Sequence, residues 1–462
     1  MTTASVVVSF LANLFFSKLF NAVTNFESVF ITALILTLII PVKFPLNLMY
    51  MIGASGIAMA SKYLLTVEKR HLFNPAAVSV AAISLLSPEH TATWWIGTPS
   101  MLPFVLIGGL LLVRKAQRES LVFSFIVAYI IAITLGSLIN HGSITTLFST
   151  WQLSVFHSAV FFFAFVMLTE PLTSPATENK QTYYSYLVAI LYSTPVLRVF
   201  NFTPELALCI GNVFSYIISP NFRQYLPLLW KKQVSPDTYV FAFRPQTPIK
   251  FRPGQYLEWT LPHKNMDSRG NRRYFSISSS PTEEDLMMTV KFYNPSSSYK
   301  KELISMTEGK QIVAAQLAGD FVLPKDLSKP LVFIAGGVGI APFRSMIQYI
   351  LDKNLSVNIV LLYTNRTVED ILFSDIFERA GQNGVATIYN LTDSNSVPPN
   401  WMGTTGYITS DIIRQKIPDF ALRKFYLSGP QLMVQRFEQT LKDTGVKRKN
   451  IITDFFPGYN EK

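Results

Sequence analysis

The chain changes its pattern of hydrophobic and polar positions near residue 230. Before that point, long apolar runs are separated by short polar segments, and residues 120–169 contain no Asp, Glu, Lys or Arg. After it, short segments alternate apolar and polar positions, and apolar runs separated by helical segments follow. Apolar runs near the thickness of a bilayer are typical of membrane helices, whereas alternation with a period of two is typical of strands. The pattern therefore predicts a polytopic α-helical membrane domain over residues 1–228, followed by soluble domains.

Eight apolar runs in the first part are long enough, or nearly so, to cross about 30 Å of hydrocarbon as helices. We expect membrane spans at residues 25–42, 45–61, 74–88, 100–113, 121–140, 154–170, 183–200 and 204–221. An earlier apolar stretch, residues 5–20, contains Lys18 and lacks a small-residue cleavage site, so it is not typical of a cleavable signal. We interpret that stretch as an interfacial helix.

Basic residues are distributed unequally between the alternate loops of this layout. If the N-terminus lies inside, the inner loops contain Lys62, Lys69, Arg70, Arg114, Lys115, Arg118, Lys180, Arg223, Lys231 and Lys232. The outer loops keep only Lys43 and Arg198. Loops rich in Lys and Arg stay on the cytoplasmic side of a membrane. The layout therefore predicts an integral protein of a bacterial cell membrane whose soluble half is cytoplasmic.

The soluble half contains two different strand patterns. Alternating segments at residues 239–243, 255–260 and 285–292 are bounded by Pro, Gly and Ser, which is typical of a small antiparallel β-barrel. Apolar runs at residues 331–335, 357–363 and 424–428 alternate with helical stretches, which is typical of an α/β layer with a parallel sheet. We place the barrel at residues 229–328 and the α/β domain at residues 329–462.

Composition narrows the classes of function. The net charge is +11 and the pI is near 9.4, but the basic residues are scattered and form no stripe with aromatic residues, so nucleic-acid binding is not expected. Many of them flank apolar spans, where they would touch anionic lipid. The single cysteine, Cys209, excludes an intrachain disulfide and a four-cysteine iron–sulfur cluster. No metal site is predicted.

A candidate flavin motif lies in the barrel segment. Arg273-Tyr274-Phe275-Ser276 combines a guanidinium group that can pair with phosphate oxygens, an aromatic ring that can pack on a flavin, and a hydroxyl. The motif resembles the Arg-x-aromatic-Ser motif of the ferredoxin–NADP reductase family, and the resemblance covers about residues 235–459. It implies FAD, with Arg273 on the phosphate, Phe275 on the flavin face and Ser276 near the flavin N5. Tyr274 stays open as an alternative stacking ring.

Further residues of the barrel segment align with the FAD-binding positions of that family. The resemblance places Val290, Lys291, Ser297 and Ser298 where relatives wrap the FAD phosphates and adenine. Each of these positions alone is weak evidence, because serine-rich turns are common in loops.

A candidate nicotinamide site follows in the α/β segment. Residues 336–342 form a glycine-rich string that follows a strand and opens a helix, where backbone amides can approach a pyrophosphate. The family resemblance adds residues after two later strands and near the C-terminus. It implies that the nucleotide and flavin contacts include Gly336, Gly337, Gly339, Pro342, Thr364, Arg366, Ser428, Gly429, Met433 and Phe456.

The same resemblance implies three catalytic side chains, Ser276, Ser428 and Asp454. Ser428 takes the place of a cysteine in the family's nicotinamide motif and keeps a small polar group beside the hydride path. Arg366 stands alone after its strand and is followed by Glu369 and Asp370, whereas a 2′-phosphate usually requires clustered basic or hydroxyl groups. Between NADH and NADPH, the string favours NADH.

The membrane half contains two proline breaks at the same predicted edge, Asn74-Pro75 and Glu170-Pro171. The strings at 74–77, 107–115 and 169–175 resemble the RnfD/NqrB family of flavin-carrying membrane subunits over residues 25–225. Many relatives carry FMN on a threonine of a Ser-Gly-Ala-Thr-like motif, which this chain lacks. The nearest string, residues 174–177, ends at Thr177 but contains Pro175, so the resemblance implies FMN in the membrane domain without supporting a covalent link.

Together these features predict a membrane-bound NAD(P)H:acceptor oxidoreductase. Hydride would pass to FAD, and electrons would pass to a membrane flavin, a quinone or another downstream redox carrier. Because paired helix breaks also occur in transporters, a redox-driven ion pump or a transporter regulated by the flavin domain is the alternative. A haem-type ferric reductase or NADPH oxidase needs histidine pairs on two helices. The upstream histidines, His71, His90, His141 and His157, form no such ladder.

Overall fold

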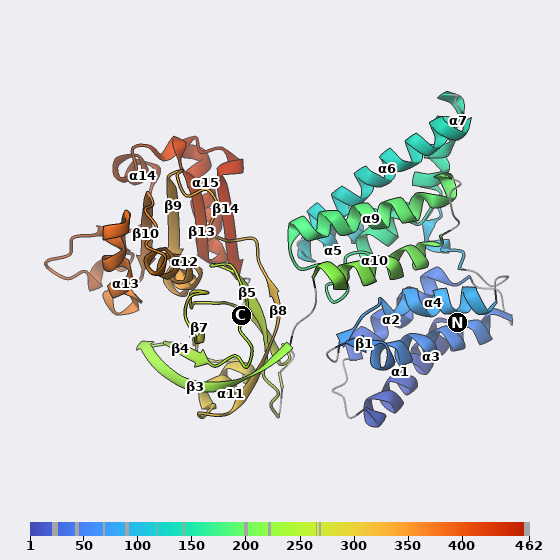
Figure 1. Cartoon of the computed structure of the whole chain (residues 1–462), viewed down its shortest axis with the longest axis horizontal. Coiled ribbons are helices and arrows are strands. Elements are labelled where there is room, and N and C mark those ends of the chain that lie inside the picture. The colour runs from blue at the N-terminus through green and yellow to red at the C-terminus, as the bar shows by residue number, and fades with distance from the viewer. Residues whose placement is uncertain are drawn as a thin grey trace. The chain divides into compact units, whose positions relative to one another are not determined.

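The computed structural model describes residues 1–20, 26–41, 46–67, 70–87, 92–116, 118–141, 144–197, 202–219, 223–264, 266–267 and 269–456. The chain forms two compact units, Met1–Asn221 and Phe222–Lys462 (Figure 1). The units divide before residue 228, where we expected the membrane domain to end, because the first strand of the second unit, β3, already begins at Arg223.

The first unit is helical, and most of its helices overlap the predicted apolar runs, whereas α7 lies between two of them. They are α1 (Thr2–Leu19), α2 (Phe26–Ile39), α3 (Leu46–Leu64), α4 (Pro75–Leu86), α5 (Leu102–Ala116), α6 (Glu119–His141), α7 (Ile144–Trp151), α8 (Val160–Phe162), α9 (Glu178–Leu197) and α10 (Pro204–Ile218). Short elements complete it: β1 (Thr66–Val67), β2 (Arg70–His71), the 3₁₀ turn η2 (Trp95–Gly97) and the π-helical turns η3 (Gln152–Phe156) and η4 (Phe163–Met167).

Two helices of the described residues, α1 and α6, are long and apolar enough to cross a membrane. Residues 146–156 and 160–167 would together make a third crossing, bent by 51°. Other apolar helices, among them α2, α4 and α10, are shorter. The first unit is therefore a bundle with apolar helices of membrane-spanning length, and the eight-span layout remains a prediction.

The first helix differs from the interfacial helix that we expected at residues 5–20. Its buried positions are the polar ones, Ser5, Ser9, Asn13 and Ser17, while Leu11 and other large apolar side chains point outward. This stripe packs on α3, where the Ser5 Oγ lies 3.0 Å from the Ser55 Oγ and the Tyr63 hydroxyl donates to the Asn13 Oδ1 at 2.8 Å. An interfacial helix would expose its polar face. Polar residues turned toward a neighbouring helix are instead typical of a membrane-embedded helix.

The second unit begins with a six-stranded antiparallel sheet. Its order is β6-β5-β8-β3-β4-β7, with β3 (Arg223–Ser235), β4 (Thr238–Phe243), β5 (Tyr256–Thr260), β6 (Arg272–Ser276), β7 (Leu286–Lys291) and β8 (Gln311–Ala318). Apolar side chains such as Phe241, Trp259 and Met288 form its core, together with Tyr299 of α11 (Ser298–Ser305). Among the described residues, the bridge Ile277–Met288 joins the two end strands, so the sheet curves toward closure without a continuous ladder between them.

The second sheet of this unit is parallel, as the sequence predicted. Its order is β12-β11-β10-β9-β13-β14, formed by β9 (Leu331–Gly336), β10 (Ile359–Asn365), β11 (Val385–Leu391), β12 (Thr404–Thr405), β13 (Lys424–Pro430) and β14 (Ile451–Phe456). Alternate residues of β9 face opposite layers: Phe333 packs with Phe343 of α12 (Ala341–Asp352), and Ile334 belongs to the core beside Val434 of α15 (Gln431–Thr444). The helices α13 (Ser374–Arg379) and α14 (Ser410–Lys416) complete the two layers (Figure 1).

Candidate redox sites

The predicted flavin motif lies on β6, and its side chains alternate between the two faces of the strand. Arg273 and Phe275 share one face, and both contact Tyr299: the guanidinium carbon lies 5.0 Å from its ring centroid and the Phe275 ring lies 6.2 Å away. Tyr274 points the other way, is 49% exposed and donates its hydroxyl to the Glu258 Oε2 at 3.0 Å. A ligand held by Arg273 would therefore meet Phe275 before Tyr274.

The N-terminus of α11 lies beside Arg273, and two of its N–H groups already have side-chain partners. Ser297 caps this helix by accepting from the Lys300 N–H at 3.3 Å. Ser298 donates its backbone N–H to the Asp267 Oδ2 at 2.9 Å, and its hydroxyl lies 3.0 Å from the His263 Nε2. A helix N-terminus next to an arginine is a suitable place for a phosphate. Arg273 thus lies over the ring of Tyr299, the residue that follows Ser297 and Ser298 in the chain.

Asp267 stabilises this corner of the site. Partial burial disfavours its charge, but the N–H of Ser298 and the side chain and N–H of Arg269 donate to it, and these contacts lower the pKa of Asp267 to about 2. The carboxylate therefore stays charged and keeps the loop before β6 attached to α11.

Two further predicted flavin contacts, Val290 and Lys291, lie on β7, and the Lys291 carbonyl accepts from the Lys300 Nζ of α11 at 2.7 Å. The side chain of Val290 is buried in the core of the antiparallel sheet. The Lys291 Nζ lies 3.0 Å from the Asp237 Oδ2 and 3.6 Å from the Asp370 Oδ1, and these carboxylates raise its pKa despite partial burial. Lys291 thus joins the antiparallel sheet to the α/β layer. A sequence motif could not reveal this, because the two carboxylates are far from Lys291 along the chain.

The glycine-rich string forms a tight turn between β9 and α12, and the Ser428–Met433 segment packs directly on it. The turn is the 3₁₀ segment η5 (Gly337–Ile340), which contacts both β13 and β7. A Cβ added to Gly339 would lie 2.6 Å from the Gly429 Cα, and one added to Gly336 would lie 2.7 Å from the Met433 Cε. The two predicted nicotinamide motifs are therefore in mutual contact, and Pro342 lies in the first turn of α12, which follows the glycine-rich turn.

Two buried hydroxyls mark the space beside these motifs. Neither the Ser276 Oγ nor the Ser428 Oγ has a hydrogen-bond partner among the described residues, although both serines are at most 4% exposed. A buried hydroxyl without a partner costs about 1–3 kcal/mol. Polar ring atoms of a bound flavin and a bound nicotinamide would supply such partners. With Arg273 and the α11 N-terminus, the residues present fit FAD and a nicotinamide nucleotide.

The remaining predicted contacts lie around this core. Thr364 is the last residue but one of β10, and its hydroxyl is buried without a partner among the described residues. Arg366 is 79% exposed in its side chain and lies 3.9 Å from the Asp393 Oδ2. Asp454 pairs with Ser428 across β13 and β14. Phe456 ends β14, but its side chain lies outside the described residues.

Burial raises the pKa of Asp454 to about 7. Since its ordinary value is about 3.9, folding favours the protonated form, and the stability that this proton contributes is complete below about pH 4 and is lost as the pH rises through about 7. We expect the unaltered chain to lose thermal stability relative to Asp454→Asn between pH 5 and pH 8, measured as the temperature of FAD release. Parallel pH curves for the two proteins would contradict this.

The first unit contains two further features, and one is a polar cluster at the predicted helix breaks. Asn74 caps α4 through the N–H groups of Ala76 and Ala77 and donates its own N–H to the Asn212 Oδ1 at 2.9 Å. The Asn212 amide donates to the Thr173 carbonyl, and the His71 Nε2 lies 3.2 Å from the Glu170 Oε1. The two breaks are therefore joined through α10.

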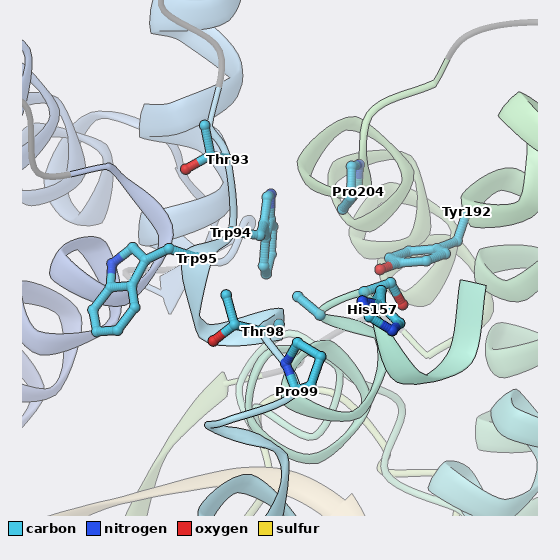
Figure 2. A pocket seen from close by; sticks show the side chains of 11 residues that line it. Thr93, Trp94, Trp95, Thr98, Pro99, His157, Tyr192 and Pro204 are labelled. Atoms are coloured by element: carbon cyan, nitrogen blue, oxygen red, sulfur yellow. The ribbon is translucent and has the colours of Figure 1, made fainter. Parts of the chain in front are cut away.

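The other feature is a cavity of about 390 Å³ within the first unit (Figure 2). Its lining residues are Thr93, Trp94, Trp95, Gly97, Thr98, Pro99, His157, Ser158, Ala159, Tyr192 and Pro204. Figure 2 shows that Trp94, His157 and Tyr192 approach it from three different segments, whereas Trp95 turns away. Within the described residues, His157 and Tyr192 make no hydrogen bond that would occupy their polar atoms.

The backbone around this cavity departs from regular structure. Trp94 has φ +49°, a left-handed conformation that is rare for a large side chain and occurs at functional sites. His157 lies at the 51° bend between two π-helical turns, which are also frequent at functional sites. Gly97 permits close approach, because an added Cβ would lie 2.6 Å from the Ser158 carbonyl carbon.

Sequence reasoning missed this cavity and the carboxylate behind it. Glu205 lies in the first turn of α10, is 1% exposed and accepts from the Trp94 Nε1 at 3.2 Å. It lies inside the apolar run 204–221, where an acidic residue is itself a signal of function. The adjacent tryptophans Trp94 and Trp95, in a short segment between two apolar runs, were a second sequence signal of this cavity.

Comparisons with known proteins agree with the predicted division into a membrane part and a reductase part. Residues 95–225 match the model of the NQR2, RnfD, RnfE family, and residues 333–439 match that of the oxidoreductase NAD-binding domain. A glycine betaine monooxygenase reductase subunit of Chromohalobacter salexigens is 27% identical over 218 residues, 45% of this chain and 57% of that protein. NADH-cytochrome b5 reductase 1 of Ajellomyces capsulatus is 26% identical over 259 residues, 53% of this chain and 82% of that protein.

Solved structures also resemble part of this chain. The flavohem-like FAD/NAD binding domain of a Vibrio cholerae nitric oxide dioxygenase is 19% identical, with a TM-score of 0.45, over 50% of this chain and 98% of that one. This chain thus spans little more than half of the first relative and most of the second. The comparisons therefore match one part of the chain to the NQR2, RnfD, RnfE family and another to the oxidoreductase NAD-binding domain, which agrees with a membrane segment joined to a module of the reductase type.

Proposed function

We propose that the protein is a membrane-bound NADH:acceptor oxidoreductase whose acceptor is bound in the membrane unit. The main support is the covalent fusion of a module of the reductase type with a membrane segment from a family of electron-transfer subunits. Bound FAD would supply the conversion from two-electron hydride chemistry to single-electron transfer. Arg273 and the α11 N-terminus would hold its phosphates, Phe275 would pack on the ring, and the Ser276 hydroxyl would bond its edge.

The chain's own residues would orient the nicotinamide. Gly336, Gly337 and Gly339 form the turn that would receive the pyrophosphate, and the buried Ser428 hydroxyl would bond the nicotinamide end. Asp454, next to Ser428 across the strands, would present a protonated carboxyl below about pH 7.

An acidic surrounding favours NADH over NADPH. Arg366, the one basic side chain immediately after β10, already lies 3.9 Å from the Asp393 Oδ2, and Glu369 and Asp370 follow it. A 2′-phosphate would need a free cation here and would meet three carboxylates instead.

For the membrane acceptor, we propose that the cavity at Trp94, His157 and Tyr192 binds a quinone ring. In the predicted layout this cavity lies near the outer ends of the spans, so electrons from a cytoplasmic FAD would reach it through a further redox carrier in the membrane unit. The imidazole and the phenol can donate to the two quinone oxygens, and the Trp94 ring, whose N–H is already used by Glu205, can pack its face on the quinone. A flavin mononucleotide would need a cation for its phosphate, and no Lys or Arg is among the described lining residues. The overall reaction would be NADH + H⁺ + quinone → NAD⁺ + quinol.

The proposed location is a bacterial membrane with the reductase module in the cytoplasm, because Lys and Arg are concentrated in the inner loops. If α1 also spans the bilayer, the N-terminus lies on the outer side, and Lys18 joins the basic residues on the inner side.

The experiment uses the full chain, purified and loaded with FAD, with NADH or NADPH as donor and with ferricyanide or a short-chain quinone as acceptor. We expect faster reduction with NADH, and quinone reduction that falls about tenfold, equivalent to about 1.4 kcal/mol, in Trp94→Leu and His157→Leu. Ferricyanide reduction should stay unchanged in both, since it needs only the reductase module.

Trp151→Leu is the matched control, because Trp151 is a partly exposed tryptophan of α7 outside the cavity. Equal quinone rates in all variants would exclude this cavity as the acceptor site. If FMN is extracted from the membrane unit and neither substitution changes the rate of quinone reduction, the acceptor in the membrane unit is a flavin instead of a quinone in this cavity.

A further inference from the structure

A buried arginine joins the two halves of the reductase module. Arg344 lies in the first turns of α12 and is 8% exposed. Its Nη2 donates to the Glu283 Oε1 at 2.8 Å, and its Nη1 contacts the Glu283 Oε2 and donates to the Ser278 carbonyl at 3.0 Å. This bidentate pair links the α/β layer to the loop that follows β6.

Neighbouring contacts extend the connection along α12. The Ser345 hydroxyl donates to the Ser279 carbonyl at 2.6 Å. Glu283 also accepts from the Ser280 N–H at 2.6 Å, and the Thr282 hydroxyl contacts Asp352 at the other end of α12. We call Arg344, Ser345, Ser278, Ser279 and Glu283 the interdomain clamp.

The clamp lies between the two candidate cofactor motifs. Ser278 comes two residues after Ser276, whose buried hydroxyl has no partner among the described residues. Arg344 comes two residues after Pro342, the end of the glycine-rich string. A rigid fork of two parallel hydrogen bonds fixes geometry as well as distance, whereas a buried ion pair contributes little net stability. The clamp is therefore placed to set how the two motifs face each other.

We propose that Arg344 is a positioning residue for hydride transfer. By holding the loop after β6 against the first turns of α12, it fixes the approach of the nicotinamide to the flavin without touching either. The proposal rests on the proposed function, because it assumes that hydride passes between these two motifs.

The test compares Arg344→Lys and Glu283→Gln with the unaltered chain, each as the full-length, FAD-loaded protein. Lysine keeps the charge but cannot form the fork. We expect the rate constant of flavin reduction by NADH to fall by about 10- to 100-fold, while FAD content and the affinity for NADH change less than about threefold. Hydrogen–deuterium exchange in residues 278–283 should accelerate in both variants.

Arg423→Lys is the matched control. Arg423 is also buried, at 7% exposure, and donates to the Asp419 Oδ1 at 2.6 Å and to the Leu331 carbonyl at 3.0 Å, but it lies within the α/β layer alone. Its substitution should leave flavin reduction unchanged. Faster exchange in residues 278–283 with an unchanged reduction rate would overturn the positioning role and leave the proposed function standing. Failure of the unaltered, FAD-loaded chain to be reduced by NADH would refute both.

Discussion

Arg273→Ala is expected to weaken FAD binding by about 100-fold. The guanidinium group would make two charge-assisted hydrogen bonds to the pyrophosphate, each worth roughly 1.5 kcal/mol or more, and a loss of about 3 kcal/mol corresponds to about two powers of ten in Kd. The measurement is the FAD-to-protein ratio after gel filtration, followed by titration of the apoprotein with FAD.

Arg272→Ala is the matched control for this prediction. Arg272 is the adjacent residue of β6, is exposed and points to the other face of the strand, away from Tyr299. It should leave the FAD content unchanged. Loss of FAD in Arg272→Ala, with retention in Arg273→Ala, would mean that the motif is displaced by one residue and that Tyr274 is the stacking ring.

Arg273 also supports the loop before β6, so folding needs its own control. Its Nη1 donates to the carbonyls of Arg269 and Gly270 at 2.8 and 3.2 Å. If the alanine variant loses FAD only because this loop opens, excess FAD will not restore the spectrum of the bound flavin. Restoration at high FAD concentration would show that the loss is one of affinity.

The reductase half was predictable because its signals are local. Strand positions follow from alternation along a few residues, and each face of β9 indeed packs on a different layer. The glycine-rich turn was recognisable for the same reason. Closure of the antiparallel sheet into a barrel, in contrast, depends on whether β6 and β7 pair with each other. The sequence of neither strand alone decides whether they pair.

Contacts between distant segments could not be predicted. The partners of Lys291 and Arg344 depend on how the sheets face one another, so an isolated Lys or Arg in the sequence does not reveal them. In the membrane unit, apolar runs located the helices, but the inward polar stripe of α1 and the cavity at Trp94 arise from helix packing and from a strained backbone. These departures from local rules occur where function is expected.

Gly339→Ala is expected to reduce the rate of flavin reduction by NADH by roughly 100-fold. The new Cβ would overlap the Ser428 carbonyl oxygen and lie 2.6 Å from the Gly429 Cα. Both are backbone atoms, which cannot turn aside as a side chain could, so the glycine-rich turn and the Ser428 segment must separate. A displacement of about 1 Å at a reacting centre costs about two powers of ten in rate. The measurement is rapid-mixing absorbance of the FAD-loaded protein with NADH.

Gly381→Ala is the matched control, because a Cβ at Gly381 would meet nothing within 4 Å. Reduction by dithionite, which bypasses the nucleotide site, should proceed equally in both variants, and so should retention of FAD. A normal reduction rate in Gly339→Ala would show that the two motifs tolerate separation, and the nucleotide would then have to bind away from their contact. A rate lost together with FAD would instead place the damage in the fold, since Arg273 and the α11 N-terminus, which would hold the flavin phosphates, lie on other elements.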